Sequence, residues 1–248
     1  MKKILLIIPI FTFGISSLTS QTADEVIALY YDAIGGKEKF ESVTSWHLIG
    51  GSKLTNNKPG EFQFIYVKPN KLKVKTVIDS VKIIQSTIGK KGWNVVPPMG
   101  INTPTPIDER SAEQLLGQNA LVLGPFYNYK EKGVNVNYEG LKKIDSTEYK
   151  MIKVWKTEAG PKSYVYLDKK TDLIMVIETE TTAQGKRVTY RNYISSYKEV
   201  DGLMMPFSFA TYFNGNEVTR LELDEIILNR KYSDDVFELP ESTENNKQ

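Results

Sequence analysis

The chain has 248 residues, with 32 Lys and Arg, 30 Asp and Glu, one His and no Cys. The lack of Cys excludes a disulfide framework, a thiolate metal site, a Cys nucleophile and a lipid-modified N-terminal Cys. The near balance of charge excludes bulk electrostatic attraction to nucleic acid, so we expect no nucleic-acid partner.

The first twenty residues have the pattern of a secretory signal peptide. Lys2 and Lys3 give a basic start, an apolar run extends from Ile4 to Ile15, and small or polar residues follow up to Ser20. The apolar run is too short for a membrane span.

We expect cleavage near Ser20 and Gln21. Loss of the two N-terminal lysines lowers the 32 basic residues to 30, which equals the 30 acidic residues. The mature protein is predicted to be periplasmic, without a lipid anchor. One domain is expected over residues 21–240, followed by a frayed polar tail over 241–248.

The first element after the signal is predicted to be a helix. Thr22 and Glu25 fit a capping box, and Val26 and Tyr30 recur at helical spacing. Gly35 then ends the helix.

Residues 44–96 change to a period of two. Phe62, Phe64 and Tyr66 occupy every second position, and Leu72 and Val74 alternate with lysines. This alternation, with turn residues between the runs, predicts four or five antiparallel strands.

Residues 97–107 contain four prolines, which cannot donate hydrogen bonds inside a sheet. We therefore expect a long exposed loop there, followed by a helix over 108–118. The pattern leaves open whether residues 119–129 form another short helix.

Strands resume in the second half of the chain. Asn214-Gly215 is a strong type I′ hairpin signal, because both central positions of this turn need positive φ. Residues 233–237 are predicted to form one helical turn that directs Phe237 inwards. The remaining strands are expected near 134 and over 149–157, 163–168, 173–182, 187–198, 203–213 and 217–228.

The expected fold class is mainly β (α+β). We expect a single curved antiparallel sheet that forms an open half-barrel of about eleven strands. Open sheets of this size tend to curl. Two or three helices would cover the concave face, and because they supply few apolar side chains, we expect an apolar cavity there.

The sequence contains no convincing catalytic or metal-binding constellation. His47 is the single His and is interpreted as structural. Gly89 to Gly92 lacks the spacing of a phosphate-binding loop and is predicted to be a hairpin turn. Asp224 and Glu225 point to opposite faces of a strand, with Glu225 expected either at the rim of the apolar face or as an inward-facing charge. We therefore predict no enzyme, no metal and no cofactor.

The apolar residues supply the candidate site. Bulky aromatic side chains and Met205 on one face of the strands would suit an acyl chain, which gains about 0.8 kcal/mol per buried CH₂. Ordinary sheet core is the alternative interpretation of the same residues. The candidates for the cavity lining are Phe62, Phe64, Tyr66, Leu72, Val74, Trp93, Met205, Phe207, Phe209, Leu221 and Leu223.

Three stretches carry a resemblance to a family. They are "NYISSYKEVDGLMMPFSFATYFNGNEVTRLELDEIILNRKYSDDVFELP", "ADEVIALYYDAIGGKEKFESVTSWHLIG" and "YVYLDKKTDLIMVIE". Together they resemble the periplasmic outer-membrane lipoprotein-sorting proteins of the LolA/LolB-like superfamily, over most of residues 22–240. The resemblance implies a half-barrel of about eleven strands, lidded by helices, that holds lipids or lipidated proteins.

The resulting hypothesis is a soluble periplasmic carrier that binds acyl chains of lipoproteins or lipids for transfer toward the outer membrane. We expect a monomer with transient membrane contact and envelope proteins as further partners. The first alternative is a non-enzymatic envelope protein-interaction module with the same fold and a filled core. The second is a lipid hydrolase, which would need a catalytic constellation that the sequence does not show.

Overall fold

The computed structural model describes residues 21–54, 59–144, 146–183 and 185–240. The predicted signal peptide and polar tail lie outside the described residues. The helices are α1 (Ala23–Ala33), α2 (Lys37–Ser42), α3 (Glu109–Leu116) and α4 (Ala120–Leu123), with 3₁₀ turns at Pro97–Met99, Gly117–Asn119 and Asp234–Val236. The strands are β1 (Ser45–Leu54), β2 (Pro59–Val67), β3 (Lys71–Ile78), β4 (Val81–Ile88), β5 (Lys91–Val96), β6 (Ile101–Ile107), β7 (Asn135–Ile144), β8 (Thr147–Trp155), β9 (Lys162–Asp168), β10 (Ile174–Ala183), β11 (Lys186–Ser195), β12 (Lys198–Val200), β13 (Leu203–Met205), β14 (Ser208–Phe213) and β15 (Asn216–Leu228).

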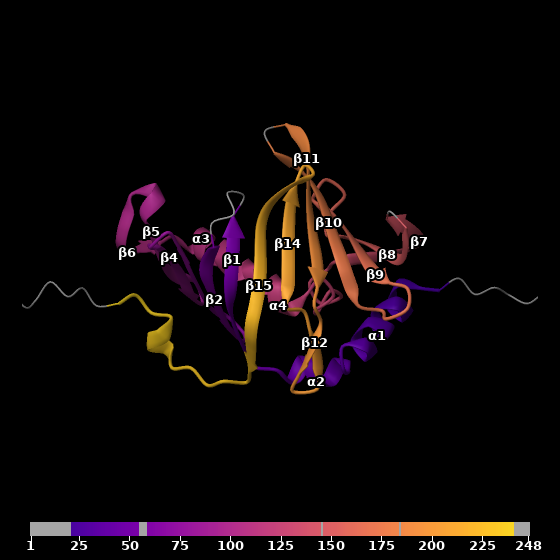
Figure 1. Cartoon of the computed structure of the whole chain (residues 1–248), viewed down its shortest axis with the longest axis horizontal. Helices are drawn as coiled ribbons and strands as arrows, with labels where there is room; N and C mark the ends of the chain where they lie inside the picture. Colours follow the sequence, from indigo (N-terminus) through magenta and orange to yellow (C-terminus); the bar gives the residue numbers. More distant parts are fainter. Residues whose placement is uncertain (1–20, 55–58, 145, 184, 241–248) are drawn as a thin grey trace, which may run out of the picture.

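Within the described residues, thirteen strands form one antiparallel sheet in the order β6-β5-β4-β3-β2-β1-β15-β14-β11-β10-β9-β8-β7. Strands β12 and β13 form a separate hairpin. The sheet is not closed, and the helices lie on one side of it (Figure 1). The mainly β, open-sheet fold class is confirmed, with thirteen strands in place of about eleven and four α-helices in place of two or three.

The strands that come first and last along the chain, β1 and β15, pair with each other in the middle of the main sheet. Strand β1 pairs with β2 on one side and with β15 on the other. Two runs of neighbouring strands therefore meet at this pair: β1 to β6 on one side, and β15, β14 and β11 to β7 on the other. We call the side that packs against the helices the inner face and the opposite side the outer face.

The expected loop over 97–107 is wrong for most of its length. Residues 97–99 form a 3₁₀ turn, but Ile101–Ile107 form strand β6, in which Pro106 lies opposite Trp93. Strand β6 is an edge strand, paired with β5 alone. Proline is tolerated there because an edge strand has one side on which no N–H group is needed.

The expected strand over 203–213 is divided by Pro206. Strand β13 ends at Met205 and pairs with β12, whereas β14 begins at Ser208 and pairs with β11 and β15. Proline has no N–H to donate to a ladder. The chain therefore changes from one sheet to the other at this residue.

Two local signals in the sequence are confirmed. The Thr22 side chain accepts a hydrogen bond from the Glu25 amide, and the Glu25 side chain accepts one from the Thr22 amide, which completes the capping box. Asn214 and Gly215 have φ angles of 46° and 86° between β14 and β15. Both angles are positive, as a type I′ turn requires.

The C-terminal segment 229–240 folds back across the outer face. Phe237 is fully buried, and its carbonyl accepts hydrogen bonds from Ser86 Oγ at 2.8 Å and Trp93 Nε1 at 2.9 Å. Lys73 Nζ donates to the Val236 carbonyl at 2.8 Å. The expected inward turn of Phe237 is therefore confirmed, and it anchors the segment to β3, β4 and β5.

We predict that Phe237→Ala lowers the free energy of unfolding by about 3–5 kcal/mol, because it removes a fully buried aromatic ring and leaves a cavity. Chemical denaturation measures this change. Leu239→Ala is the matched control, since Leu239 is 45% exposed and its loss should change stability by less than about 0.5 kcal/mol. Equal effects of the two substitutions would show that Phe237 is not the anchor.

His47 has a structural position on the outer face of β1. It is buried, its Nδ1 lies 2.8 Å from the Tyr232 hydroxyl, and its Nε2 has no hydrogen-bond partner in the described residues. Burial lowers the pKa of His47, and Arg230 lowers it further. Both effects favour the neutral form of the ring in the folded protein.

Because the folded-state pKa of His47 is lowered, its contribution to stability is present above the unfolded pKa of about 6.5 and is lost as the pH falls below it. We predict that the difference in unfolding free energy between the wild type and His47→Asn is smaller at pH 5.5 than at pH 7.5. Denaturation of both proteins at the two pH values measures it. A difference that does not change with pH would contradict the assignment.

Candidate functional site

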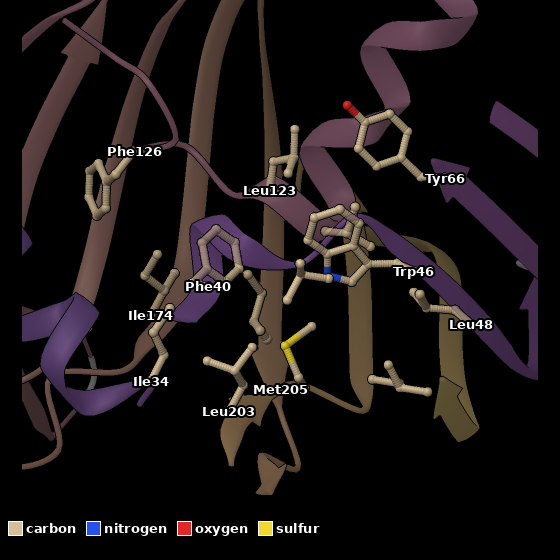
Figure 2. Close-up of a cluster of buried hydrophobic side chains, with 14 of the residues drawn as sticks. Ile34, Phe40, Trp46, Leu48, Tyr66, Leu123, Phe126, Ile174, Leu203 and Met205 are labelled. Carbon is tan, nitrogen blue, oxygen red and sulfur yellow. The ribbon is translucent and has the colours of Figure 1, made fainter. Parts of the chain in front are cut away.

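The inner face carries the main hydrophobic core of the protein. Side chains from the helices, among them Phe40 and Leu123, pack against Trp46 and Leu48 of β1 in one buried cluster (Figure 2). The Trp46 ring stacks on Tyr66 at a centroid distance of 5.6 Å and meets Phe40 at 6.3 Å. Contacts between these aromatic rings therefore hold α2 against the sheet.

The structure brings most of the predicted lining residues together on this face. Two of them, Phe62 and Phe209, are only partly buried and pack against the edge of the cluster. Those inside the buried cluster are Phe64, Tyr66, Leu72, Val74, Met205, Phe207, Leu221 and Leu223. They are at most 9% exposed, so they are covered by the helices in this state.

Trp93 is placed elsewhere. It pairs across the strands with Ser86, which pairs with Lys73, and all three side chains meet the C-terminal segment on the outer face. The sequence assigned Trp93 to the inner set by alternation, but its indole binds the Phe237 carbonyl. It therefore belongs to the anchor of the C-terminal segment.

A β-bulge changes which residues of β15 face inwards. The register with β1 shifts between Ile49 and Gly50, opposite Glu225 and Leu223. Beyond the bulge, Ile226 and Leu228 are buried in the core, and Glu225 is exposed. The expectation that Glu225 lies at the rim of the apolar face or faces inwards is wrong, because one extra residue reverses the facing of all that follow.

The partly covered end of the inner face is a small patch on four neighbouring strands. Ser52 of β1 lies opposite Leu221 of β15, which lies opposite Phe209 of β14. On the other side of Ser52 lies Gly60 of β2, and Phe62 is two residues further along that strand. We call Phe62, Ser52, Leu221 and Phe209 the inner patch. Its two Phe rings are partly buried, so it continues the core toward the surface.

The Ser52 hydroxyl is an unusual feature of the inner patch. The residue is 6% exposed, and its Oγ has no hydrogen-bond partner among the described residues. A buried hydroxyl without a partner costs about 1–3 kcal/mol. The patch therefore combines two apolar rings with one unused hydrogen-bonding group.

Neutral polar pairs extend the inner face beyond the patch. Thr211 Oγ1 donates to Asn192 Oδ1 at 2.7 Å, and the hydroxyls of Ser163 and Thr179 lie 2.8 Å apart. These residues lie on β14, β11, β9 and β10. The inner face is thus apolar beneath the helices. It becomes polar but uncharged where Thr211, Asn192, Ser163 and Thr179 lie.

A lysine closes one side of the core. Lys68 Nζ lies 5.0 Å from the ring centroids of both Trp46 and Tyr127, and it donates to the Glu41 carbonyl at 2.8 Å. Burial lowers the pKa of Lys68. The two rings and the carbonyl stabilise the ammonium group in a partly desolvated position.

In the described part of the chain, no three His, Cys, Asp or Glu side chains lie together as metal ligands would. None of the helices among the described residues is long and apolar enough to cross a membrane.

Comparisons with protein-family models and with curated protein sequences returned no match. Solved structures share the fold. A domain described as an outer membrane lipoprotein-sorting protein, from Vibrio parahaemolyticus, has a TM-score of 0.53 and 14% identity, over 86% of this chain and 94% of that one. A LolA superfamily protein from Nitrosomonas europaea has a TM-score of 0.52 and 12% identity, over 88% and 98% of the two chains.

A DUF1329 family protein from Desulfovibrio piger is similar to the same degree, with a TM-score of 0.53 and 12% identity, over 86% of this chain and 97% of that one. The resemblance to the lipoprotein-sorting superfamily is therefore confirmed at the level of the fold. At 12–14% identity, the likeness concerns the fold alone.

We predict that Ser52→Ala raises the free energy of unfolding by about 1 kcal/mol, because it removes a buried hydroxyl that has no partner. Ser86→Ala is the matched comparison. Its hydroxyl is also buried but donates to the Phe237 carbonyl, so its loss should lower stability by about 1 kcal/mol. Urea denaturation of both variants measures the two changes. A loss of stability in Ser52→Ala would mean that the hydroxyl has a partner in solution.

Proposed function

We propose that the chain is a non-enzymatic, exported carrier that binds acyl chains of lipids or lipoproteins between the inner face and the helices, for transfer toward the outer membrane. The observation that carries the proposal is the inner patch, where Phe62 and Phe209 are left partly uncovered at the end of a continuous apolar core. An acyl chain that enters there would meet the buried apolar side chains of the core.

The helical segment 109–123 is the element that would move to admit a ligand. It is broken into α3, a 3₁₀ turn and α4, and it packs on the sheet through side chains such as Leu115 and Val122. Leu116 and Leu121 of the same segment are only partly buried against the core. A short, interrupted helix held by side chains is easier to displace than a paired strand.

The energetics favour such an exchange. Ten methylene groups that enter the core would contribute about 8 kcal/mol, which can offset the loss of contacts between the helical segment and the sheet. The unpaired Ser52 hydroxyl would donate to the carbonyl of an ester or amide at the head of the chain. The neutral polar pairs beyond it suit the region where an acyl chain joins its headgroup.

The fold and the sequence support the proposal in different ways. The solved structures that share the fold include a domain described as lipoprotein-sorting. The first twenty residues have the pattern of the export signal that a periplasmic carrier needs. Together they favour a ligand of the acyl-bearing class and a location in the envelope.

We predict that Phe209→Gln and Phe62→Gln each weaken the binding of a dansyl-labelled fatty acid by on the order of tenfold, equal to about 1.4 kcal/mol. Each substitution replaces an apolar ring of the inner patch with a polar side chain at a partly exposed site. Fluorescence titration measures the affinity.

Ile65→Gln is the control for these variants. Ile65 is a partly buried residue of β2 that pairs with His47 on the outer face, so its substitution should leave fatty-acid affinity unchanged. Unchanged affinity in both Phe variants, with their folds intact, would remove the inner patch from the binding site.

A second candidate function rests on the burial of the inner face. The buried members of the predicted lining are at most 9% exposed, as expected if they are permanent core. In that case the protein would be an envelope interaction module. It would then take up no fatty-acid probe and would retain a specific protein partner through affinity purification.

A further inference from the structure

The outer face of the second half of the sheet carries two neighbouring depressions. The first, of about 160 Å³, lies over β11, β14 and β15, and the second, of about 320 Å³, lies over β7, β8, β9 and β10. Both are lined by Tyr rings and by polar or charged side chains, and the second also by Ile144 and Met151. The first is lined by Tyr193, Ser195, Ser208, Ala210, Tyr212 and Arg220. We call the two together the outer groove.

Strand pairing places the depressions on one line across the sheet. Met151 pairs with Tyr166, Tyr166 with Val176, Val176 with Tyr193, and Tyr193 with Ala210. The smaller residues of this row, Met151, Val176 and Ala210, are buried and form the floor. The two Tyr residues are partly exposed and stand above it.

The two Tyr rings of this row are separated by one intervening strand. Neighbouring strands lie about 4.8 Å apart, so Tyr166 and Tyr193 repeat at about 10 Å along the groove. This distance is close to the length of two linked sugar rings. Tyr212 also meets Tyr193 edge to face at a centroid distance of 5.3 Å, which fixes the wall of the first depression.

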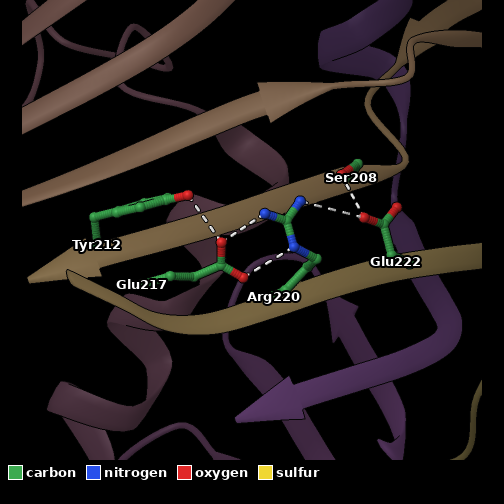
Figure 3. A network of polar contacts seen from close by, with 5 residues as sticks. All are labelled: Ser208, Tyr212, Glu217, Arg220 and Glu222. Atoms are coloured by element: carbon green, nitrogen blue, oxygen red, sulfur yellow. Dashed lines mark hydrogen bonds and ion pairs between the residues drawn. The ribbon is translucent and has the colours of Figure 1, made fainter. Parts of the chain in front are cut away.

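The charged side chain of the first depression, Arg220, is already paired. Arg220 donates to Glu217 at 2.9 and 2.6 Å, and its Nη1 lies 3.8 Å from Glu222 (Figure 3). Glu217 also accepts from the Tyr212 hydroxyl at 2.8 Å, and Glu222 accepts from Ser208 at 2.8 Å. An ionic ligand would have to break these pairs, whereas a neutral ligand can use their remaining lone pairs and N–H groups.

In the second depression the two carboxylates are paired in the same way, and Lys142 and Lys143 line its β7 side. Its two carboxylates are Glu178, which pairs with Arg191, and Glu180, which pairs with Arg187. Arg191 also donates to the Tyr193 hydroxyl at 3.4 Å. Ion pairs and Tyr rings therefore lie side by side from β15 to β9, and the two lysines lie beyond them on β7.

We propose that the outer groove binds an extended, neutral oligosaccharide, with sugar rings placed on Tyr166 and Tyr193. The C–H faces of a pyranose ring suit the electron-rich face of an aromatic ring. Its hydroxyls suit the paired carboxylates, the guanidinium groups and the hydroxyls of Ser195 and Ser208. The groove lies on the opposite side of the sheet from the acyl site, so a carrier of this design would hold glycan and acyl chain independently.

The described structure also leaves this part of the outer face accessible. The C-terminal segment makes its anchoring contacts with Lys73, Ser86 and Trp93, on β3, β4 and β5. The outer groove begins beyond β1, on the strands from β15 to β7. A long ligand can therefore cross several strands without displacing that segment.

The test is isothermal titration calorimetry of the full mature chain with cellohexaose, chitohexaose and maltohexaose as probes. We expect at least one hexasaccharide to bind, and its monosaccharide to bind at least tenfold more weakly because it contacts only one ring. Tyr166→Ala and Tyr193→Ala should each weaken hexasaccharide binding at least tenfold. Fatty-acid affinity should not change in either variant, which separates this site from the acyl site.

Two further variants complete the design. Tyr166→Leu keeps apolar bulk but removes the aromatic face, so it should lose affinity even if the Ala variant folds poorly. Tyr190→Ala, which alters an exposed Tyr outside both depressions, should bind as the wild type does. Absence of binding to all three hexasaccharides, or binding that the Tyr166 and Tyr193 variants leave intact, would overturn the proposal. So would a protein partner that these variants release while no hexasaccharide binds.

Discussion

The antiparallel pairing of β1 with β15 is the contact on which the rest of the structure depends. It joins two runs of strands that are otherwise separate in the sheet, because β1 belongs to one run and β15 ends the other. It also contains the bulge that turns Ile226 and Leu228 into the core. Trp46, which begins this pair, stacks on Tyr66 and packs with Phe40 of α2. The helical cover is therefore also tied to the sheet at this pair.

From this pair outward, the two faces of the sheet differ in chemistry. The inner face is an apolar core that ends in two partly covered Phe rings and an unpaired Ser hydroxyl. The outer face is divided, with the C-terminal segment over β3 to β5 and Tyr rings among ion pairs over the other half. A sheet with alternating side chains keeps two such surfaces apart, since each residue serves only one of them.

The sequence predicted those features that depend on local chemistry. The capping box at Thr22 and the turn at Asn214-Gly215 follow from residue types within a few positions, and both are confirmed. Alternation also placed most of the inner-face residues correctly. It failed where distant pairing decides the outcome: Trp93 faces the C-terminal segment, and Glu225 is turned outward by a bulge. The prolines of β6 suggested a loop because its edge position was not visible in the sequence. The outer groove likewise depends on strand order.

The central claim is that the core beneath the helices opens to hold an acyl chain. Native mass spectrometry of the mature protein, purified from its own envelope without detergent and measured before and after organic extraction, tests this most directly. The account predicts a discrete added mass that contains an acyl chain and is lost on extraction. A mass equal to that of the polypeptide alone, together with no uptake of a fluorescent fatty acid, would contradict it and would mean that the inner face is permanent core.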